Sequence, residues 1–540
     1  MTDQAQPAAP NLPNIIVILV DDMGFSDIGC YGSEIETPHL DGLAENGIRF
    51  THMYNCARCC PTRASLLTGL YPHQAGVGGM TQDQGVPGYR GFLSNSCVTI
   101  AEALKARGYA TAMSGKWHVG GHYFPNKPET WTPAAPGYPT PRQRGFDAFF
   151  GTVSGGGSYF RPPTLMGNDK LIEPYGDVFY YTDAISENAV AMIQDSGSHG
   201  TPFFLYVAYT APHWPLHALE EDIARFEGRY HDGWDAIRTR RHEEQKGMGL
   251  LDPKWEISPR DAQAPPWEEA EHKDWQDRRM AVYAAQVYAI DRGVGRIMAK
   301  LRELGMADNT LVLFLSDNGG CAEFLAEDVD KPNKFRYNIP TRDGGPVHVG
   351  NTPALMPGPE TTFMSYELPW ANASNAPFRR FKKWVHEGGI ATPLIAHWPA
   401  AVRESSLVHH PAHVIDIMAT CLDAAGAAYP KELNGSAITP LEGVSFLPAI
   451  RGETWAPVRP IFWEHMGNRA VRQGRWKLVS EHGRPWELYD MVEDRTELSD
   501  LAKANRPKAQ ELEALYQTWA KRCHVLTPET LKQMASQRQS

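Results

Sequence analysis

Ile15-Ile16-Val17-Ile18-Leu19-Val20 is an unbroken apolar, mostly β-branched run that leads directly into Asp21-Asp22. A run of this length and composition is typical of a strand buried on both faces, the kind found in parallel sheets. Apolar runs of strand length return at 109–114, 203–209, 311–316 and 393–398, and helical periodicity covers 37–47, 99–108 and 281–304. This alternation predicts an α/β domain with helices on both faces of a sheet.

The pattern changes near Pro440. Short strand candidates at 461–464, 469–472 and 476–480 follow one another across turns, and a helical period covers 507–522. A chain of 540 residues also exceeds what one hydrophobic core usually organises. We therefore predict a large domain over residues 1–440 and a C-terminal subdomain over 441–540, built as a small antiparallel sheet with a terminal helix.

The composition limits the partners that the chain can have. Its formal net charge is −11, with 63 acidic against 52 basic residues, which argues against nucleic acid or an anionic membrane as the main partner. The segment 15–20 is far shorter than the roughly 20 residues of a membrane helix. Residues 1–13 are polar and proline-rich without the features of a signal peptide, so we expect a cytoplasmic protein, or a periplasmic one if the sequence was trimmed. Eight cysteines without regular spacing suggest reduced thiols.

Two strand ends carry oxygen ligands. Asp21-Asp22 follows the first strand, and Asp317-Asn318 follows the strand 311–316 in the same way. The carboxyl ends of strands in an open parallel sheet are where ligands bind, and a cation relieves the repulsion of adjacent carboxylates. These four side chains therefore predict a site for a hard cation, Ca²⁺ or Mg²⁺; the alternative is two ordinary polar turns.

The segment Cys59-Cys60-Pro61-Thr62-Arg63-Ala64-Ser65-Leu66-Leu67-Thr68-Gly69 is the most informative motif. A cysteine beside an arginine near a helix start has the setting of a nucleophile, although buried thiols of this kind are commonly structural. The spacing Cys-x-Pro-x-Arg with a following Leu-Thr-Gly resembles the signature of the sulfatase family. Other segments resemble that family in order along the chain: Thr37-Pro38-His39-Leu40-Asp41, Gly115-Lys116-Trp117-His118, Arg144-Gly145-Phe146-Asp147, Ala211-Pro212-His213, Ser316-Asp317-Asn318-Gly319 and Glu387-Gly388-Gly389.

The resemblance, which is greatest to bacterial arylsulfatases, implies an alkaline-phosphatase-like fold with a central mixed, mostly parallel sheet in the catalytic domain. It implies that Cys59 is oxidised to formylglycine by a formylglycine-generating or an anaerobic sulfatase-maturing enzyme. Cys60 occupies the variable position of the signature. The implied reaction is hydrolysis of sulfate monoesters through a formylglycine hydrate and a sulfated hemiacetal.

The resemblance also implies the roles of the site residues. Asp21, Asp22, Asp317, Asn318 and the modified Cys59 would hold Ca²⁺, with Mg²⁺ as the alternative. Arg63 would bind the hydrate, and His118 would take the proton that releases sulfate. The sulfate group would be bound by Lys116, His213 and Lys382. Either His213 or Lys382 would be the acid that protonates the leaving oxygen. Only the spacing to Glu387 selects Lys382 over Lys383, and His217 has no counterpart and is expected at the rim.

Three alternatives to an arylsulfatase are a phosphate or phosphonate ester hydrolase of the same superfamily, a carbohydrate sulfatase, and a non-catalytic binder of sulfated glycans. Three long stretches, 122–144, 230–277 and 321–380, match neither secondary-structure period. Loops of that length are uncommon unless functional, and we expect them to select a sulfated small molecule or a sulfated sugar. Their aromatic residues either stack on such a substrate or pack the loops: Trp131, Trp234, Trp255, Trp267, Tyr366 and Trp370.

Overall fold

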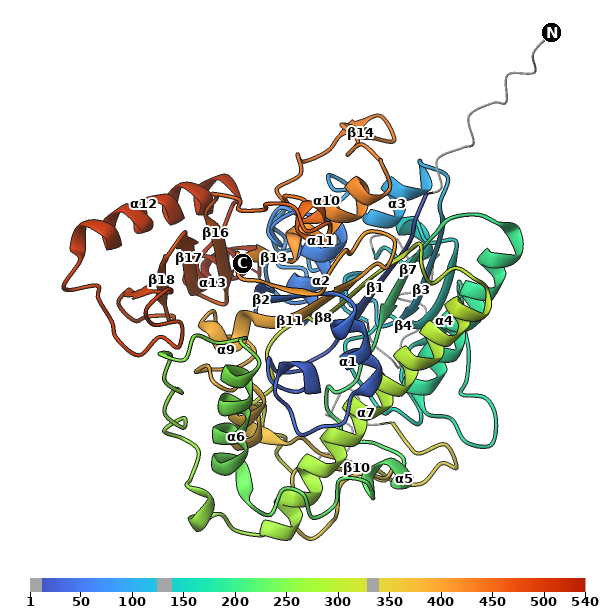
Figure 1. Cartoon of the computed structure of the whole chain (residues 1–540), viewed down its shortest axis with the longest axis horizontal. Coiled ribbons are helices and arrows are strands. Elements are labelled where there is room, and N and C mark those ends of the chain that lie inside the picture. Colours follow the sequence, from blue (N-terminus) through green and yellow to red (C-terminus); the bar gives the residue numbers. More distant parts are fainter. Residues whose placement is uncertain (1–11, 124–137, 328–338, 540) are drawn as a thin grey trace.

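The computed structural model describes residues 12–123, 138–327 and 339–539, and a large twisted sheet crosses its centre (Figure 1). The strands in order across this sheet are β12 (Ser406–Val408), β2 (Ile48–Tyr54), β11 (Ala391–His397), β8 (Thr310–Ser316), β1 (Asn14–Val20), β7 (Phe203–Ala208), β3 (Ala110–Gly115), β4 (Ala148–Thr152), β5 (Leu165–Gly167) and β6 (Lys170–Leu171), with β13 (Ala412–His413) paired to β2.

The sheet is mixed and mostly parallel. β8, β1, β7, β3 and β4 run parallel, whereas β11 runs antiparallel to both of its neighbours. The prediction of a mixed, mostly parallel sheet is therefore confirmed. β1 lies between β7 and β8, and its apolar residues 15–20 are fully buried. Its alternate side chains enter two cores, Ile16, Ile18 and Val20 on one face and Ile15, Val17 and Leu19 on the other.

Helices cover both faces, as the alternation predicts. One face carries α1 (Pro38–Glu45), α4 (Tyr181–His199) and α7 (Lys273–Glu303). The other carries α2 (Cys59–Thr68), α3 (Ile100–Lys105), α10 (Ile415–Ala424) and α11 (Leu447–Ile450). Thr99 and Glu102 form a capping box at the start of α3. In the part of the chain that the structure describes, no helix has both the length and the hydropathy that crossing a bilayer requires.

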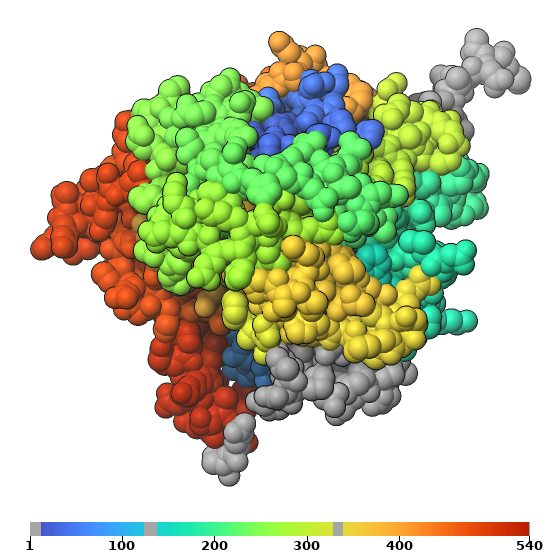
Figure 2. All heavy atoms as spheres, turned by 90° about the horizontal axis from the view of Figure 1, so that it is seen from below, coloured from blue at the N-terminus to red at the C-terminus, as the bar shows by residue number. Residues whose placement is uncertain are grey.

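The C-terminal part is a four-stranded antiparallel meander with two helices. Its elements are β16 (Ile461–His465), β17 (Asn468–Gln473), β18 (Trp476–Ser480), β19 (Glu487–Asp490), α12 (Arg506–Arg522) and α13 (Pro528–Gln539). The predicted small sheet and terminal helix are confirmed, and β19 and α13 are additions. This part, coloured red, projects to one side of the molecule in both views (Figures 1 and 2).

The expectation that 230–277 is irregular is wrong. The stretch contains α6 (Gly233–Gly247), and α7 begins at Lys273, before the predicted start at Ala281. The buried face of α6 includes Arg238, Arg241, His242 and Gln245, which are paired with buried polar groups. A helix with such a polar buried face has little apolar period to detect.

The other two stretches hold little regular structure in their described parts. Residues 321–380 contain β9 (His348–Val349), β10 (Thr362–Phe363) and α8 (Glu367–Ser374), and residues 138–144 contain one 3₁₀ turn, Arg142–Arg144. Residues 124–137, which include Trp131, and residues 328–338 lie outside the described residues.

A buried ionic cluster joins the C-terminal sheet to the large domain. Glu387, at the start of α9 (Glu387–Ile390), accepts hydrogen bonds from Tyr54 of β2, Lys477 of β18 and Arg495, at 3.0, 2.8 and 3.1 Å. Lys477 also pairs with Glu497 at 2.7 Å. Burial raises the pKa of Glu387, but the charges of Lys477 and Arg495 outweigh this effect and hold it at about 2. The motif Glu387-Gly388-Gly389 is therefore an anchor between the two parts of the molecule.

Lys477→Met should destabilise the protein by about 3–5 kcal/mol, because it removes the ion pair of the buried Glu497 and one of the two ion pairs of the buried Glu387. Lys508→Met, which removes a surface pair with Glu511, should cost under about 1 kcal/mol. The urea concentration at the unfolding midpoint measures both effects. Equal midpoints for the two variants would contradict the assignment of Glu387 and Lys477 as an anchor.

Candidate active site

The four predicted oxygen ligands meet at the ends of two neighbouring parallel strands. Val20 of β1 lies opposite Ser316 of β8, so Asp21-Asp22 and Asp317-Asn318 leave the sheet side by side. The Nδ2 of Asn318 donates to Oδ1 of Asp22 at 2.7 Å, across 296 positions of sequence. The backbone N–H of Asp22, which has a φ of 68°, donates to Oδ1 of Asp317 at 3.3 Å. All four residues are buried.

The donor set fits a hard divalent cation. Among the residues that the structure describes, Oδ1 of Asp21 and Oδ1 of Asn318 are buried and have no hydrogen-bond partner. Buried oxygens without a partner are costly unless something satisfies them. Carboxylate and amide oxygens are the ligands that Ca²⁺ and Mg²⁺ prefer, so a cation at this position accounts for both orphaned atoms.

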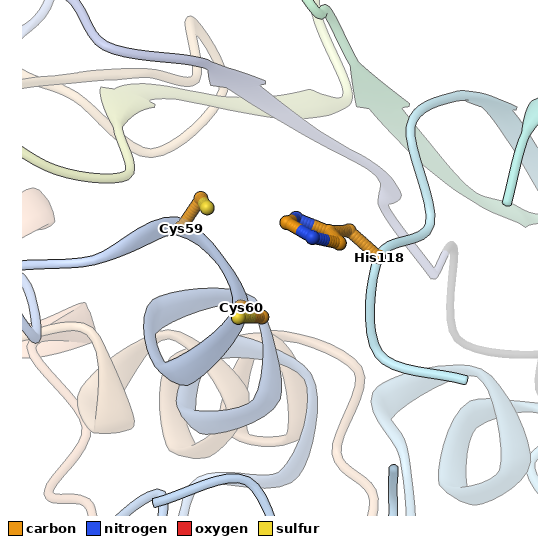
Figure 3. A group of neighbouring side chains, drawn as sticks. All are labelled: Cys59, Cys60 and His118. Carbon is orange, nitrogen blue, oxygen red and sulfur yellow. The ribbon is translucent and has the colours of Figure 1, made fainter. Parts of the chain in front are cut away.

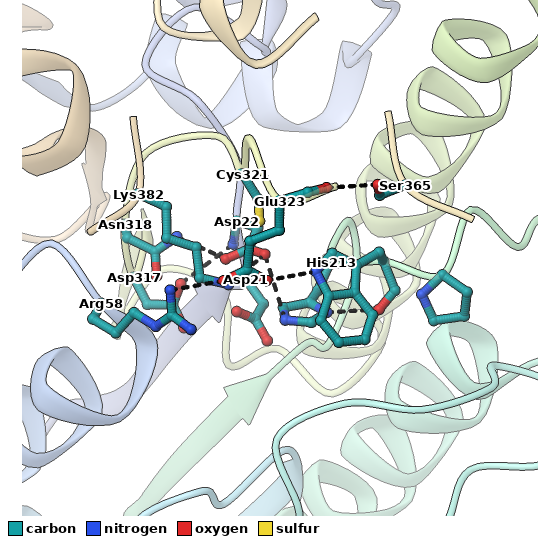
Figure 4. A network of polar contacts seen from close by, with 12 residues as sticks. Asp21, Asp22, Arg58, His213, Asp317, Asn318, Cys321, Glu323, Ser365 and Lys382 are labelled. Carbon is teal, nitrogen blue, oxygen red and sulfur yellow. Dashed lines mark hydrogen bonds and ion pairs between the residues drawn. The ribbon is translucent and has the colours of Figure 1, made fainter. Parts of the chain in front are cut away.

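Three cationic side chains surround the carboxylates. Arg63 reaches Oδ2 of Asp317 through Nε at 3.0 Å and through Nη2 at 2.8 Å. The ammonium of Lys116 contacts Asp21, and that of Lys382 donates to Oδ2 of Asp22 at 2.8 Å (Figure 4). Three carboxylates thus face three permanent cations, and a bound divalent ion would leave the site net positive. Such a site suits a monoanionic ester.

Burial and neighbouring charge shift the acidity of these groups in opposite directions. Burial and the charge of Asp21 raise the pKa of Asp317 well above its usual value. The pKa of Asp21 is lowered, because Lys116, His213 and Arg63 together outweigh the effect of burial.

His213 lies on the same side as Lys382. Its Nε2 is 3.5 Å from Oδ2 of Asp22, and its Nδ1 is 2.6 Å from the carbonyl oxygen of Trp214. That second contact makes Nδ1 the donor and directs Nε2 at the cluster. The main chain of Lys383 has a φ of 89°, and its ammonium lies over the Trp384 ring. The structure thus brings Lys382, and not Lys383, to the carboxylates.

Cys59 begins α2, and the helix directs two site residues inward. Cys59 and Arg63 are four positions apart and therefore share one helix face. The sulfur atoms of Cys59 and Cys60 and a ring nitrogen of His118 lie within 4.8 Å of one another (Figure 3). A hydrogen bond from Cys60 and the charges of His118 and Lys116 lower the pKa of the Cys59 thiol. Burial raises the pKa of Cys60, whose sulfur also contacts Gly79 and Met80.

His118 approaches from the loop after β3, opposite Cys59. It is buried with a φ of 56°, and within the described residues its Nδ1 has no hydrogen-bond partner. The room for both site histidines comes from the loop Ser154-Gly155-Gly156-Gly157. A Cβ on Gly155 would lie 2.3 Å from Nε2 of His118, and one on Gly156 would lie 3.3 Å from Cε1 of His213. Sequence reasoning missed this loop, although its run of glycines was a visible signal.

The placement of His217 at the rim is wrong. His217 is fully buried, its Nε2 contacts the carbonyl oxygen of Thr362, and its Nδ1 accepts from the backbone N–H of Tyr159. The cause is the turn 211–216, which directs His213 inward to the carboxylates and His217 into the protein core.

The described aromatic residues of the long stretches pack the protein interior. Trp234 lies 4.7 Å from Trp267 and 5.4 Å from Trp370 between ring centroids. Tyr366 stacks on Tyr283 at 4.4 Å, and Trp255 is buried beside Arg495. Of the two expectations for these five residues, packing is the one that the structure supports.

The α/β fold, the oxygen-ligand cluster and the ring of cations define a metal-assisted hydrolase of anionic esters. A family model described as sulfatase matches residues 13–427, and one described as N-sulphoglucosamine sulphohydrolase, C-terminal, matches residues 378–522. The chain belongs to the sulfatase family, whose members generally use a formylglycine and a divalent metal, and it hydrolyses sulfate esters.

Three relatives show how far the similarity extends. An uncharacterised sulfatase of Schizosaccharomyces pombe is 32% identical over 93% of this chain and 92% of its own length. An arylsulfatase of Klebsiella aerogenes is 32% identical over 82% of this chain and 92% of its own. The crystal structure of Ps i-CgsB superposes with a TM-score of 0.65 at 27% identity, covering 94% of this chain and 93% of that one.

Proposed function

We propose that this sulfatase acts through a formylglycine made from Cys59, with a Ca²⁺ ion held by Asp21, Asp22, Asp317 and Asn318. The observation that carries the proposal is the convergence of these ligands with Cys59 and three cations at the ends of β1 and β8. When bound, the metal would lower the pKa of the attacking hydroxyl and neutralise charge on the sulfate group. Modification of Cys59 would require a formylglycine-generating or an anaerobic sulfatase-maturing enzyme as partner.

The chain's own residues would divide the proton transfers. Asp317, held by Arg63, accepts the proton of the attacking hydroxyl of residue 59. Lys116, Lys382 and His213 bind the sulfate oxygens in a buried site where charges act strongly.

Protonation of the leaving oxygen and release of sulfate need separate groups. His213 or Lys382 protonates the leaving oxygen, since both approach Asp22 from one side. His118, on the Cys59 side, takes the second proton and so frees sulfate from residue 59. This division gives the two histidines of the site different tasks.

The substrate is either a small aryl sulfate or a sulfated sugar. The similarity to the arylsulfatase of Klebsiella aerogenes favours the first. The second is favoured by the similarity to Ps i-CgsB, which has been solved in complex with k-i-k-neocarrahexaose.

The proposal is tested by turnover of nitrophenyl sulfate and of a nitrophenyl phosphonate by enzyme whose Cys59 peptide has been identified by mass. We expect the aldehyde or its hydrate at residue 59, a thiol at residue 60, and turnover that favours the sulfate. Full activity with an unmodified Cys59 would refute the nucleophile, and preference for the phosphonate would favour the phosphonate-hydrolase alternative.

Removing the metal should abolish activity. Without the cation, Oδ1 of Asp21 and Oδ1 of Asn318 are left buried and unsatisfied, so the apo-enzyme should also unfold at a lower temperature. Activity after chelation should return on addition of Ca²⁺ and return less with Mg²⁺, which demands a stricter octahedron. Full activity of metal-free enzyme would contradict the proposal.

A further inference from the structure

The carboxylate of Glu323 contacts two residues, Arg58 and Trp214, each of which is adjacent in sequence to a residue of the active site. Its Oε1 pairs with Nη1 of Arg58 at 2.8 Å, and its Oε2 accepts from Nε1 of Trp214 at 2.9 Å. Arg58 directly precedes Cys59, and Trp214 directly follows His213. The backbone carbonyl of Glu323 is held by the hydroxyl of Ser365 at 2.6 Å. This carboxylate is therefore fixed in place before any substrate binds.

Glu323 and Arg58 lie closer to the protein surface than the residues of the metal site. Exposure of the side chains rises from 2% at Asp22 and Lys382, through 6% at His213, to 18% at Arg58 and 34% at Glu323. Figure 4 labels Arg58 and Glu323 together with Lys382 and His213 and marks the polar contacts among the residues drawn.

The proposed function places the leaving oxygen at Lys382 and His213. The part of the substrate attached to that oxygen must then extend outward, toward Glu323 and Arg58. These residues are thus placed to contact the leaving group and not the sulfate.

The hydrogen-bonding capacity of the pair is only partly used within the described residues. A carboxylate offers about four acceptor positions and a guanidinium five donors. Glu323 accepts one hydrogen bond at each oxygen, one of them from Nη1 of Arg58. Acceptors and donors side by side, held rigidly, match adjacent hydroxyl groups, which both donate and accept. An aryl ring or an alkyl chain offers nothing to such a pair.

We propose that Glu323 and Arg58 form a subsite that hydrogen-bonds the hydroxyl groups of the leaving group, so that the preferred substrates are sulfate esters of neutral sugars. The inference rests on the proposed function, because it needs the leaving oxygen at Lys382 and His213. Hydrogen bonds to a charged, preorganised partner are among the stronger ones. Glu323 acts here as a determinant of specificity and takes no part in the proton transfers.

The test compares three kinds of sulfate ester in mature, metal-loaded enzyme. The first kind is every singly sulfated isomer of glucose, galactose and N-acetylglucosamine. The second is cyclohexylmethyl sulfate, which matches a hexose 6-sulfate in size and as a primary alkyl ester but has no hydroxyl groups. The third is 4-nitrophenyl sulfate. The enzymes are the wild type, Glu323→Gln, which keeps the side-chain shape, and Asp183→Asn. This last variant is the matched control, because Asp183 pairs with Arg292 at similar exposures of 18% and 23% in a different part of the fold.

We expect wild-type kcat/KM for the best sugar sulfate to exceed that for cyclohexylmethyl sulfate by about tenfold or more. Glu323→Gln should lower the sugar value by about 10- to 100-fold and change the other two by less than about threefold. Asp183→Asn should change kcat/KM for each of the three kinds of ester by less than about threefold. The thermal midpoint of each variant checks that the fold is retained.

Two results would overturn the inference. If wild type hydrolyses no sugar sulfate better than cyclohexylmethyl sulfate, the subsite does not recognise hydroxyl groups. If Glu323→Gln lowers kcat/KM for all three kinds alike, Glu323 acts through the charges of Lys382 and His213 instead. In both cases the wild type still hydrolyses 4-nitrophenyl sulfate. Failure of the proposed function is a different outcome, the absence of turnover of every sulfate ester by enzyme that contains the aldehyde and the metal.

Discussion

A Cys59→Ser enzyme is expected to accept one sulfate group and then stop. The serine hydroxyl would occupy the place of the attacking hydroxyl, within reach of Asp317 and the three cations, so transfer to residue 59 remains possible. The second hydroxyl of the hydrate is missing, however, and with it the intramolecular exit through which His118 frees sulfate. Steady-state turnover should therefore fall by about 10⁴-fold or more, the scale seen when a nucleophile is removed.

Two measurements check this expectation. Intact mass should show one added sulfate group on the Cys59→Ser protein after incubation with nitrophenyl sulfate, and the position should map to residue 59. Cys60→Ser is the matched control, since the same atom change one position away leaves the signature spacing intact. A Cys59→Ser enzyme that keeps its turnover, beside a Cys60→Ser enzyme that loses it, would reverse the assignment of the nucleophile.

His118→Ala and His213→Ala should fail at different steps. Without His118, the leaving group should depart once per site in a burst, and the sulfated residue 59 should accumulate, because no base remains on the Cys59 side. Without His213, the first step itself should slow. The loss should reach about 10²- to 10⁴-fold for alkyl and sugar sulfates, whose leaving oxygens need a proton. It should be smaller for nitrophenyl sulfate, whose leaving group is stable as an anion.

Burst kinetics of leaving-group release and mass spectrometry of residue 59 distinguish the two variants. A His213→Ala enzyme that loses the same factor with good and poor leaving groups would remove His213 as the acid and point to Lys382, whose ammonium lies on the same side. A His118→Ala enzyme without a burst would place His118 in the first step.

Much of the fold was predictable because it depends on local patterns. The strand 15–20 reads as doubly buried from its composition alone, and β1 is buried on both faces. The C-terminal strands lie within a few residues of their predicted bounds. The error at α6 has the opposite cause. Its buried face is stabilised by ion pairs and hydrogen bonds with distant residues, such as Arg241 with Asp27 and Glu34, and no local pattern encodes those partners.

The sequence by itself determined the reaction class and the candidate residues, because a spacing such as Cys59-x-Pro61-x-Arg63 is a local property of the chain. It can be recognised without knowledge of the tertiary structure. Tertiary structure alone decided which neighbours share a site. Lys382 reaches Asp22 while Lys383 lies on Trp384, and His213 faces the carboxylates while His217 is buried elsewhere. The linkage of Arg58, Trp214 and Glu323 joins residues up to 265 positions apart. Side-chain direction and long-range proximity follow from how strands and loops pack, and adjacent positions in a chain point in different directions.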